Sequence, residues 1–340
     1  MEKIEYDFIS PIAPFMRAYL TEYKSQGKNP KQVEFTLRTF DQYLVKVNFL
    51  VDQYLSEDIY RGWLARWNSL RQITMYHRAL DMVRFLKYLG GCGVHCYIPR
   101  PPSSCKSTFV PYIFSFDEMS RIFKECDDWR DLVYQKDSHQ LVMPALLRLL
   151  YSTGVRINEA LSIENRDILF DKHCIVIRKT KNNSDRLAPI NDSLEAVLRE
   201  YINNRARIHK HGIEEPSSPF FVKINGEKCN SATILLRFRA ICKCAGIEHQ
   251  KGHHGIRVHD LRHTACVHAL IKMVNSGKDP YCCLPSLAVY MGHCDVHATE
   301  YYLRLAQLAY PDIIKLTEPL SGSLDDIINN AVNSHTNGTL

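Results

Sequence analysis

The sequence lacks several features that would place the chain in familiar classes of protein. It contains 12 cysteines and 15 histidines, yet it has no Cys-x-x-Cys pair, the common spacing of structural zinc sites. Cys242 and Cys244 stand near His249, His253 and His254, but not at ordinary zinc spacing, and we expect no bound metal. The sequence also shows no signal peptide and no long apolar run. We therefore expect a cytoplasmic protein with reduced core cysteines and no disulfides.

The chain has only a small excess of one sign of charge. Its 43 Lys and Arg residues against 37 Asp and Glu residues give a formal net charge of +6. Residues 1–110 hold 15 basic and 10 acidic residues, whereas the remainder holds 28 and 27. The excess therefore lies in the N-terminal third, which indicates a region that binds a phosphate backbone; a merely basic domain is the alternative. A length of 340 residues favours two domains over a single core.

The second half of the chain carries six side chains that are suited to phosphate chemistry. In order along the sequence they are Arg156, Lys181, His259, Arg262, His293 and Tyr302. Each lies in a short run whose pattern presents it to an anion or a reacting phosphate. Only their combination is specific, because each run alone has an ordinary structural interpretation.

The first run leads to Arg156. The apolar stretch 141–150 predicts a buried helix, which Gly154 can end in the left-handed conformation, so that a second short helix begins near Arg156. A guanidinium at a helix start offers a planar fork to two phosphate oxygens, and Glu159, three residues on, can hold it in place. The alternative is a surface arginine in an ordinary helix-turn-helix.

The second run is a polar turn between β-like segments. Residues 166–170 and 174–177 read as strands, and 186–190 reads as the next strand. Between the last two, Lys179 and Lys181 occupy the turn. A lysine at a hairpin tip can donate a proton to a leaving oxygen when nearby cations lower its pKa, although most turn lysines are simply solvated.

The third run, Val258–Thr264, begins a helical pattern that continues to Met273. His259 and Arg262 are three residues apart, so both project from one side of its first turn and face an anion. Metal binding does not fit this pair, because an arginine cannot ligate a metal.

The fourth run joins two short helices through Gly292 and carries His293 and, nine positions later, Tyr302. A phenol is a poor nucleophile at neutral pH unless cations surround it and its target, and the other five side chains supply such cations. The alternative is that Tyr301 and Tyr302 both serve as packing aromatics.

These runs together resemble the tyrosine recombinases, or phage-integrase family. Members carry a Thr-Gly-x-Arg-x-x-Glu box, a hairpin lysine, a His-x-x-Arg box, a Leu-Gly-His box and a tyrosine nine residues beyond that histidine. The similarity covers about Ser115 to Leu305. Two positions depart from the family pattern: Met291 replaces the usual leucine, and Lys181 is not flanked by the usual glycines. We assign Lys181 over Lys179 because it stands five residues before Arg186, as in family members.

The resemblance implies strand cleavage without metal, ATP or other cofactor. Tyr302 would attack a phosphodiester to form a 3′-phosphotyrosyl bond and release a 5′-hydroxyl, and reversal by another strand would rejoin the DNA. Three side chains would bind the non-bridging oxygens, namely Arg156, Arg262 and His293. His259 would help to accept the tyrosine proton or orient the phosphate, and Lys181 would protonate the leaving oxygen. Glu159 would steady the first box.

The expected fold is mainly α with a small β-sheet. Four amphipathic helices in residues 1–98 resemble the core-binding domain of integrases, residues 99–113 form a Pro-rich linker, and residues 114–318 form an α+β catalytic domain of the tyrosine recombinase/type IB topoisomerase kind. Residues 319–340 form a tail that either docks as a helix on a neighbouring protomer or is frayed. Six basic residues are candidate DNA contacts: Lys28, Lys31, Arg38, Arg71, Arg78 and Lys179.

The resemblance also implies partners and a location. We expect double-stranded DNA with inverted-repeat core sites, a homo-oligomer that is a tetramer in the synapse, accessory DNA-bending or directionality factors, and no membrane. The protein would be cytoplasmic and nucleoid-associated, and would integrate or excise a mobile element in preference to resolving chromosome dimers. A type IB topoisomerase-like relaxing enzyme and a catalytically silent DNA-binding regulator remain as alternatives.

Overall fold

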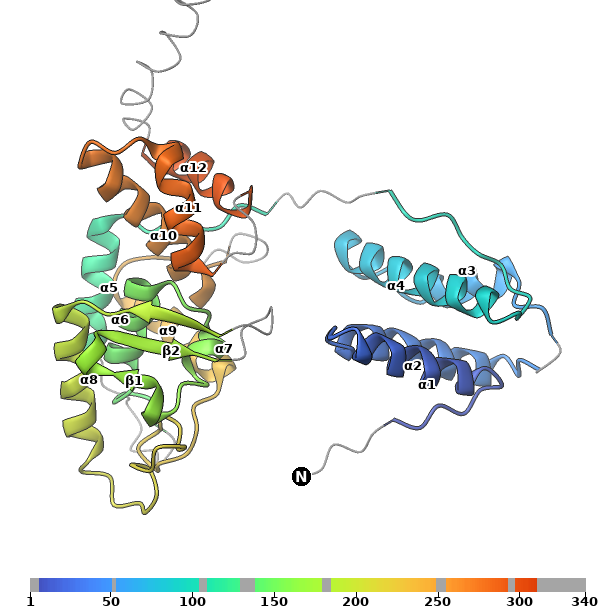
Figure 1. The fold of residues 1–340 in the computed structure, drawn as a ribbon, viewed down its shortest axis with the longest axis horizontal. Helices are drawn as coiled ribbons and strands as arrows, with labels where there is room; N and C mark the ends of the chain where they lie inside the picture. Colours follow the sequence, from blue (N-terminus) through green and yellow to red (C-terminus); the bar gives the residue numbers. More distant parts are fainter. Residues whose placement is uncertain are drawn as a thin grey trace, which may run out of the picture. The chain divides into compact units, whose positions relative to one another are not determined.

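In the computed structural model, the chain divides into two compact units, Met1–Thr108 and Phe109–Leu340 (Figure 1). The division falls inside residues 99–113, the segment interpreted above as a linker. The described residues are 6–50, 53–103, 109–128, 138–178, 185–248, 255–292 and 297–310, without the side chains of 297–300. Each unit has a hydrophobic core of its own.

The N-terminal unit builds its core from amphipathic helices. They are α1 (Ala13–Ser25), α2 (Lys31–Lys46), α3 (Glu57–Ala65) and α4 (Gln72–Gly91). Apolar side chains recur every three or four residues, so each helix turns one face inward. Four large side chains at the centre are completely buried: Met16, Phe40, Trp63 and Phe85. Helices α1, α2 and α4 pack on one another.

The second unit combines helices with one small sheet. Its helices are α5 (Phe116–Asp128), α6 (Met143–Thr153), α7 (Ile157–Ala160), α8 (Asp192–Arg205), α9 (Ser231–Cys244), α10 (Val258–Asn275), α11 (Pro280–Met291) and α12 (His297–Ala309). The antiparallel sheet has the order β1 (Ile168–Leu169), β2 (Cys174–Ile177), β3 (Arg186–Pro189). Two short 3-10 helices flank β1: Asn165–Asp167 and Phe170–Lys172. This architecture confirms the predicted fold class, mainly α with a small β-sheet.

The strand predicted over residues 166–170 is wrong for most of its length, because only two residues of it are extended. The cause is the buried carboxylate of Asp167. It accepts the backbone N–H of Glu164 at 3.0 Å and Nε of Arg178 at 2.6 Å. A local side-chain acceptor of this kind competes with strand pairing and favours a tight turn.

Helices α6 and α10 form the middle of the second unit. Helix α10 packs against α6, α11 and α12, and α6 also packs against α5 and α8. Figure 1 shows α11 and α12 at the end of this unit opposite β1. Within the described ranges, none of the helices has the length and apolar character needed to span a bilayer. The packing brings the end of α6, the start of α10 and the end of α11 together, and the candidate site lies there.

Candidate active site

Arg156 stands at the turn between α6 and α7. Gly154 ends α6 with a φ of 61°, a left-handed conformation that glycine adopts without strain, and Arg156 caps α7. Glu159 accepts the backbone N–H of Arg156 at 3.0 Å and pairs with its Nη1 at 2.7 Å. Burial raises the pKa of Glu159, but these hydrogen bonds and the charge of Arg156 outweigh burial and hold the pKa below its usual value. The ionised carboxylate therefore holds the guanidinium, as the spacing predicts.

Arg262 lies in the first turns of α10 and is 2% exposed. Its Nη1 donates to the carbonyl oxygen of Gly154, and its Nη2 donates to that of Met291 at 2.6 Å. Burial and the charge of Arg156 lower the pKa of Arg262 to about 10, so the side chain stays a cation at neutral pH. One guanidinium thus joins the ends of α6 and α11.

Tyr302 lies on α12 and is 4% exposed. Its Oη is 3.0 Å from Nδ1 of His263. Burial raises the pKa of Tyr302 to about 12, although Arg262, by its charge and a hydrogen bond, and Arg156, by its charge, lower it. The phenol and both arginines therefore belong to one cluster in a single chain. Tyr301, the rival for the role of nucleophile, is 40% exposed.

His259 occupies the first turn of α10, one helical turn before His263. The two imidazole rings meet edge to face, with centroids 4.8 Å apart. Burial lowers the pKa of His259 to about 4, and the charges of Arg262, Arg257 and Arg156 act in the same direction. The ring is therefore neutral at pH 7, where it carries one N–H donor and one lone pair.

Arg186, at the start of β3, extends the cluster. Its Nη1 donates to the carbonyl oxygen of Tyr290 at 2.9 Å, and its Nη2 lies 3.4 Å from Oε2 of Glu159. Gly292, with a φ of 64°, approaches so closely that a Cβ there would lie 2.6 Å from Nε of Arg186. The partly buried guanidinium therefore connects the carboxylate that holds Arg156 to the end of α11.

Three of the predicted site residues lie outside the described residues: Lys179, Lys181 and His293. Their neighbours in the sequence, Arg186 and Gly292, are described and are in contact with one another. The described candidates Arg156, His259, Arg262 and Tyr302 are brought together with Glu159.

The remaining predicted DNA contacts belong to the N-terminal unit. Three of them are exposed: Lys28, Lys31 and Arg71. Arg38 and Arg78 are partly buried instead, because both guanidiniums lie over Phe35, at 5.2 and 5.0 Å from the ring centre, and Arg78 also lies 3.7 Å from the ring centre of Trp67. Burial lowers the pKa of Arg78.

Sequence reasoning assigned no role to His263 or Arg186. His263 follows Arg262 directly and stands four residues after His259, a spacing that places both imidazoles on one helix face. That signal was present in the sequence. Nothing in the sequence indicates that Arg186 turns back to the end of α11, because this contact joins residues 104 positions apart.

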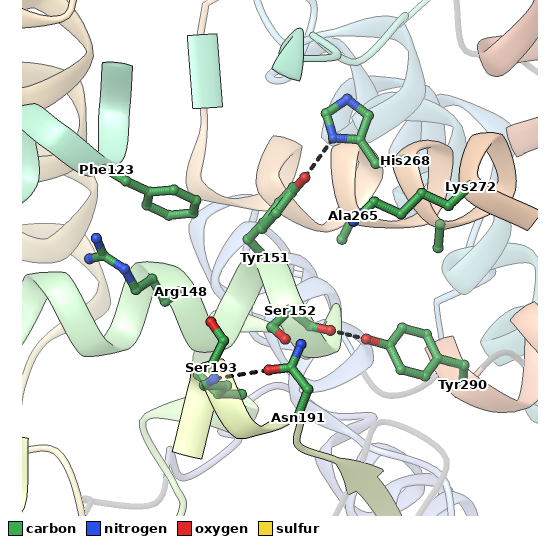
Figure 2. A pocket seen from close by; sticks show the side chains of 12 residues that line it. Phe123, Arg148, Tyr151, Ser152, Asn191, Ser193, Ala265, His268, Lys272 and Tyr290 are labelled. Carbon is green, nitrogen blue, oxygen red and sulfur yellow. Dashed lines mark hydrogen bonds between the residues drawn. The ribbon is translucent and has the colours of Figure 1, made fainter. Parts of the chain in front are cut away.

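A separate pocket of about 340 Å³ is lined by residues of α5, α6, α8, α10 and α11 (Figure 2). In it, the hydroxyl of Tyr151 bonds Nδ1 of His268 at 2.7 Å, and the hydroxyl of Tyr290 donates to the carbonyl oxygen of Ser152. The described candidate catalytic side chains do not line this pocket. Among the described residues, no group of three or more His, Cys, Asp and Glu side chains is placed to hold a metal ion.

Residues 113–308, more than half of the chain, match the phage integrase family model. The chain therefore belongs to the phage integrase family, the tyrosine recombinases, a family of enzymes that cleave and rejoin DNA.

Two curated relatives show the range of the similarity. The chain is 27% identical over 242 residues to the putative integrase/recombinase y4rB of Sinorhizobium fredii, and the matched region covers 71% of this chain and 73% of the relative. It is 28% identical over 162 residues to tyrosine recombinase XerC of Corynebacterium glutamicum, and the matched region covers 48% of this chain and 46% of the relative. With several curated relatives, the match thus spans about half of their length.

Solved structures share the fold. The XerH site-specific recombinase bound to its difH substrate superposes with a TM-score of 0.59 at 17% identity, covering 82% of this chain and 78% of that chain. The Tn1549 transposon integrase in complex with transposon right end DNA gives a TM-score of 0.58 at 16% identity, covering 87% and 99%.

Proposed function

We propose that the chain is a site-specific DNA recombinase in which Tyr302 forms the 3′-phosphotyrosyl bond. The observation that carries this proposal is the position of the Tyr302 hydroxyl in the cluster of Arg262 and Arg156, where both cations lower the pKa of a phenol that burial raises. Positive side chains around a nucleophile and its target are what attack on a charged phosphodiester requires.

The arginines stabilise the transition state in this proposal. Arg156 and Arg262, with His293, bind the non-bridging oxygens, where negative charge grows as the phosphorus becomes pentavalent. Glu159 holds Arg156 in place through the 2.7 Å ion pair, and Lys181 protonates the leaving 5′-oxygen. No step calls for a metal or nucleotide cofactor, because the phosphotyrosine retains the energy of the broken ester.

His259 orients the phosphate as a neutral hydrogen-bond donor. Burial and three nearby arginines lower its pKa to about 4, so an added proton on this ring is strongly disfavoured. These surroundings support the second of the two roles expected for His259 and disfavour the first, acceptance of the tyrosine proton.

The N-terminal unit binds the phosphate backbone of the duplex in this proposal. Its exposed cations and the charge excess of residues 1–110 support that role. The target is double-stranded DNA with inverted-repeat core sites, read by a homo-oligomer that is a tetramer in the synapse, with accessory bending or directionality factors. In this proposal the DNA clamp is residues 1–98 and the linker is residues 99–113. The catalytic domain is residues 114–318, and the tail exchanged between protomers is residues 319–340.

The cellular setting follows from this chemistry. The protein acts in the cytoplasm on nucleoid DNA, and it integrates or excises a mobile element. The name of the Tn1549 transposon integrase, a structure with the same fold, supports a mobile element.

A nicked duplex tests the covalent step. Duplexes that bind the protein are first selected from a randomised pool. Each selected duplex is then given a nick near the cleavage position, so that the cut fragment diffuses away and the protein–DNA adduct accumulates. We expect an adduct with the wild type and with Tyr301→Phe, and none with Tyr302→Phe. Tight binding without any adduct in the wild type would identify a silent regulator instead.

A plasmid assay tests the alternative of a relaxing enzyme. A recombinase that needs paired sites should leave supercoiled plasmids without such sites unchanged. Relaxation of these plasmids at a rate equal to that of plasmids carrying the selected sequence would favour the topoisomerase-like alternative.

A further inference from the structure

His263 is placed against the reacting oxygen of the proposed nucleophile. Its Nδ1 lies 3.0 Å from Oη of Tyr302, and the two rings are 5.6 Å apart with an angle of 35° between their planes. His263 is partly exposed, whereas Tyr302 is buried. None of the sequence boxes that define the family resemblance includes this histidine.

The direction of this hydrogen bond follows from the surroundings of the phenol. Burial raises the pKa of Tyr302 to about 12, so the hydroxyl keeps its proton in the free enzyme. When the phenol donates, Nδ1 of His263 must carry its lone pair toward Oη, and the ring proton lies on Nε2. A protonated oxygen and an imidazole lone pair at hydrogen-bond distance are the starting geometry for general base catalysis.

We infer that His263 is the general base that takes the proton of Tyr302 as its oxygen attacks the scissile phosphate. This inference rests on the proposed function. The Oη–H bond breaks and the proton moves to Nδ1, while the Oη–P bond forms and the bond from phosphorus to the 5′-oxygen breaks. The leaving 5′-oxygen receives its proton from Lys181. In rejoining, the 5′-hydroxyl attacks phosphorus and Nδ1 returns its proton to Oη, so the cycle consumes nothing.

Three other described groups of this cluster are poorer acceptors. Arg262 has no lone pair to offer. Burial raises the pKa of the Cys266 thiol to about 12, so it holds its own proton. Glu159 is engaged by Arg156 and by Arg186, which hold its pKa low and make it a weak base.

Single-turnover cleavage of the nicked duplex measures the role of His263. We expect His263→Ala to slow adduct formation by on the order of 10²–10³-fold with DNA binding unchanged. Added imidazole should restore part of the rate, because the position is partly exposed and a free base can replace the missing ring. Tyr302→Phe loses the same hydrogen bond and serves as the reference for thermal stability.

His268 provides the matched control on the same helix. It also bonds a tyrosine, since its Nδ1 is 2.7 Å from Oη of Tyr151, but it lies in the separate pocket (Figure 2). His268→Asn should lower thermal stability and leave the cleavage rate unchanged below its melting temperature. Imidazole should have no effect on it.

A substrate with sulfur in place of the bridging 5′-oxygen distinguishes the role of a general base from that of a general acid. A thiolate leaves without a proton, so this substrate should restore Lys181→Ala and leave His263→Ala slow. Restoration of His263→Ala by the sulfur substrate, a wild-type rate in His263→Ala, or a loss that imidazole does not relieve would each overturn the inference. Absence of any adduct in the wild type would instead sink the proposed function.

Discussion

Helix α10 carries two histidine–tyrosine pairs in opposite surroundings. His263 bonds Tyr302 within reach of two arginines, whereas His268 bonds Tyr151 at 2.7 Å through Nδ1 and Tyr310 at 3.0 Å through Nε2. Both nitrogens of His268 are therefore used by hydroxyls. The same two residue types thus build a reactive cluster at one end of the helix and a packed hydrogen-bond network further along it.

The difference teaches that neighbouring charge, more than the pair itself, decides what a tyrosine can do. Arg262 and Arg156 both act to lower the pKa of Tyr302. For Tyr151, burial and the neighbouring Tyr310 raise the pKa to about 12. Both phenols keep their protons in the free enzyme, but only Tyr302 lies beside arginines that can bind the phosphate it would attack.

The largest effect is expected at the end of α10 that holds the arginine. Arg262→Ala should slow cleavage by on the order of 10²–10³-fold, because it removes a donor to the transition state. Arg262→Lys should recover little, since a lysine lacks the planar fork that reaches two carbonyl oxygens. Adduct formation is the measurement. Arg148→Ala, which breaks a partly exposed ion pair with Asp127, is the control and should cleave normally; a folded Arg262→Ala within tenfold of wild type would contradict the prediction.

Acid should lower the stability of the second unit through protonation of His268. The pKa of His268 is about 4 in the folded chain and about 6.5 when unfolded, so between these values the unfolded chain binds a proton that the folded chain does not. The second unit should therefore lose about 2 kcal/mol of stability from this group between pH 7 and pH 5. Denaturant unfolding at both pH values should show a shallower dependence in His268→Gln. An unchanged dependence in that variant would remove His268 from the explanation.

Gly292→Ala should disturb the contact by which Arg186 supports the end of α11. The new Cβ would meet Nε of Arg186 and displace it from the carbonyl of Tyr290. Gly277→Ala is the matched control, because Gly277 also has a positive φ, of 83°, but a Cβ added there would meet nothing within 4 Å. We expect a loss of about 1 kcal/mol in Gly277→Ala from conformation alone, and about 1 kcal/mol more in Gly292→Ala. Equal losses in thermal unfolding would exclude the Arg186 contact as a cause.

The smallest effect is expected from Tyr310→Phe. It removes one hydroxyl from Nε2 of His268 and should cost about 1 kcal/mol of stability with no change in cleavage. Tyr302→Phe loses a hydrogen bond of equal length, yet it should abolish the adduct. Slow cleavage by Tyr310→Phe would show that the two ends of α10 are coupled.

Much of this site was predictable because its boxes are local. Gly154, Arg156 and Glu159 lie within six residues, so the left-handed helix end and the ion pair follow from backbone geometry and helical spacing alone. The four helices of the N-terminal unit follow from apolar spacing in the same way. The prediction of a strand over residues 166–170 failed because the Asp167 carboxylate competes for backbone hydrogen bonds, which β-propensity does not report.

The sequence by itself determined the family, the mainly helical fold and the order of the reactive side chains, because these depend on local spacing and residue chemistry. Tertiary structure alone decided which tyrosine meets the arginines, that His263 faces its oxygen, and that Arg186 supports the turn at Gly292. The His263–Tyr302 and Arg186–Tyr290 hydrogen bonds, for example, join residues 39 and 104 positions apart, so such contacts exist only once the core has packed α6, β3, α10, α11 and α12 into one unit.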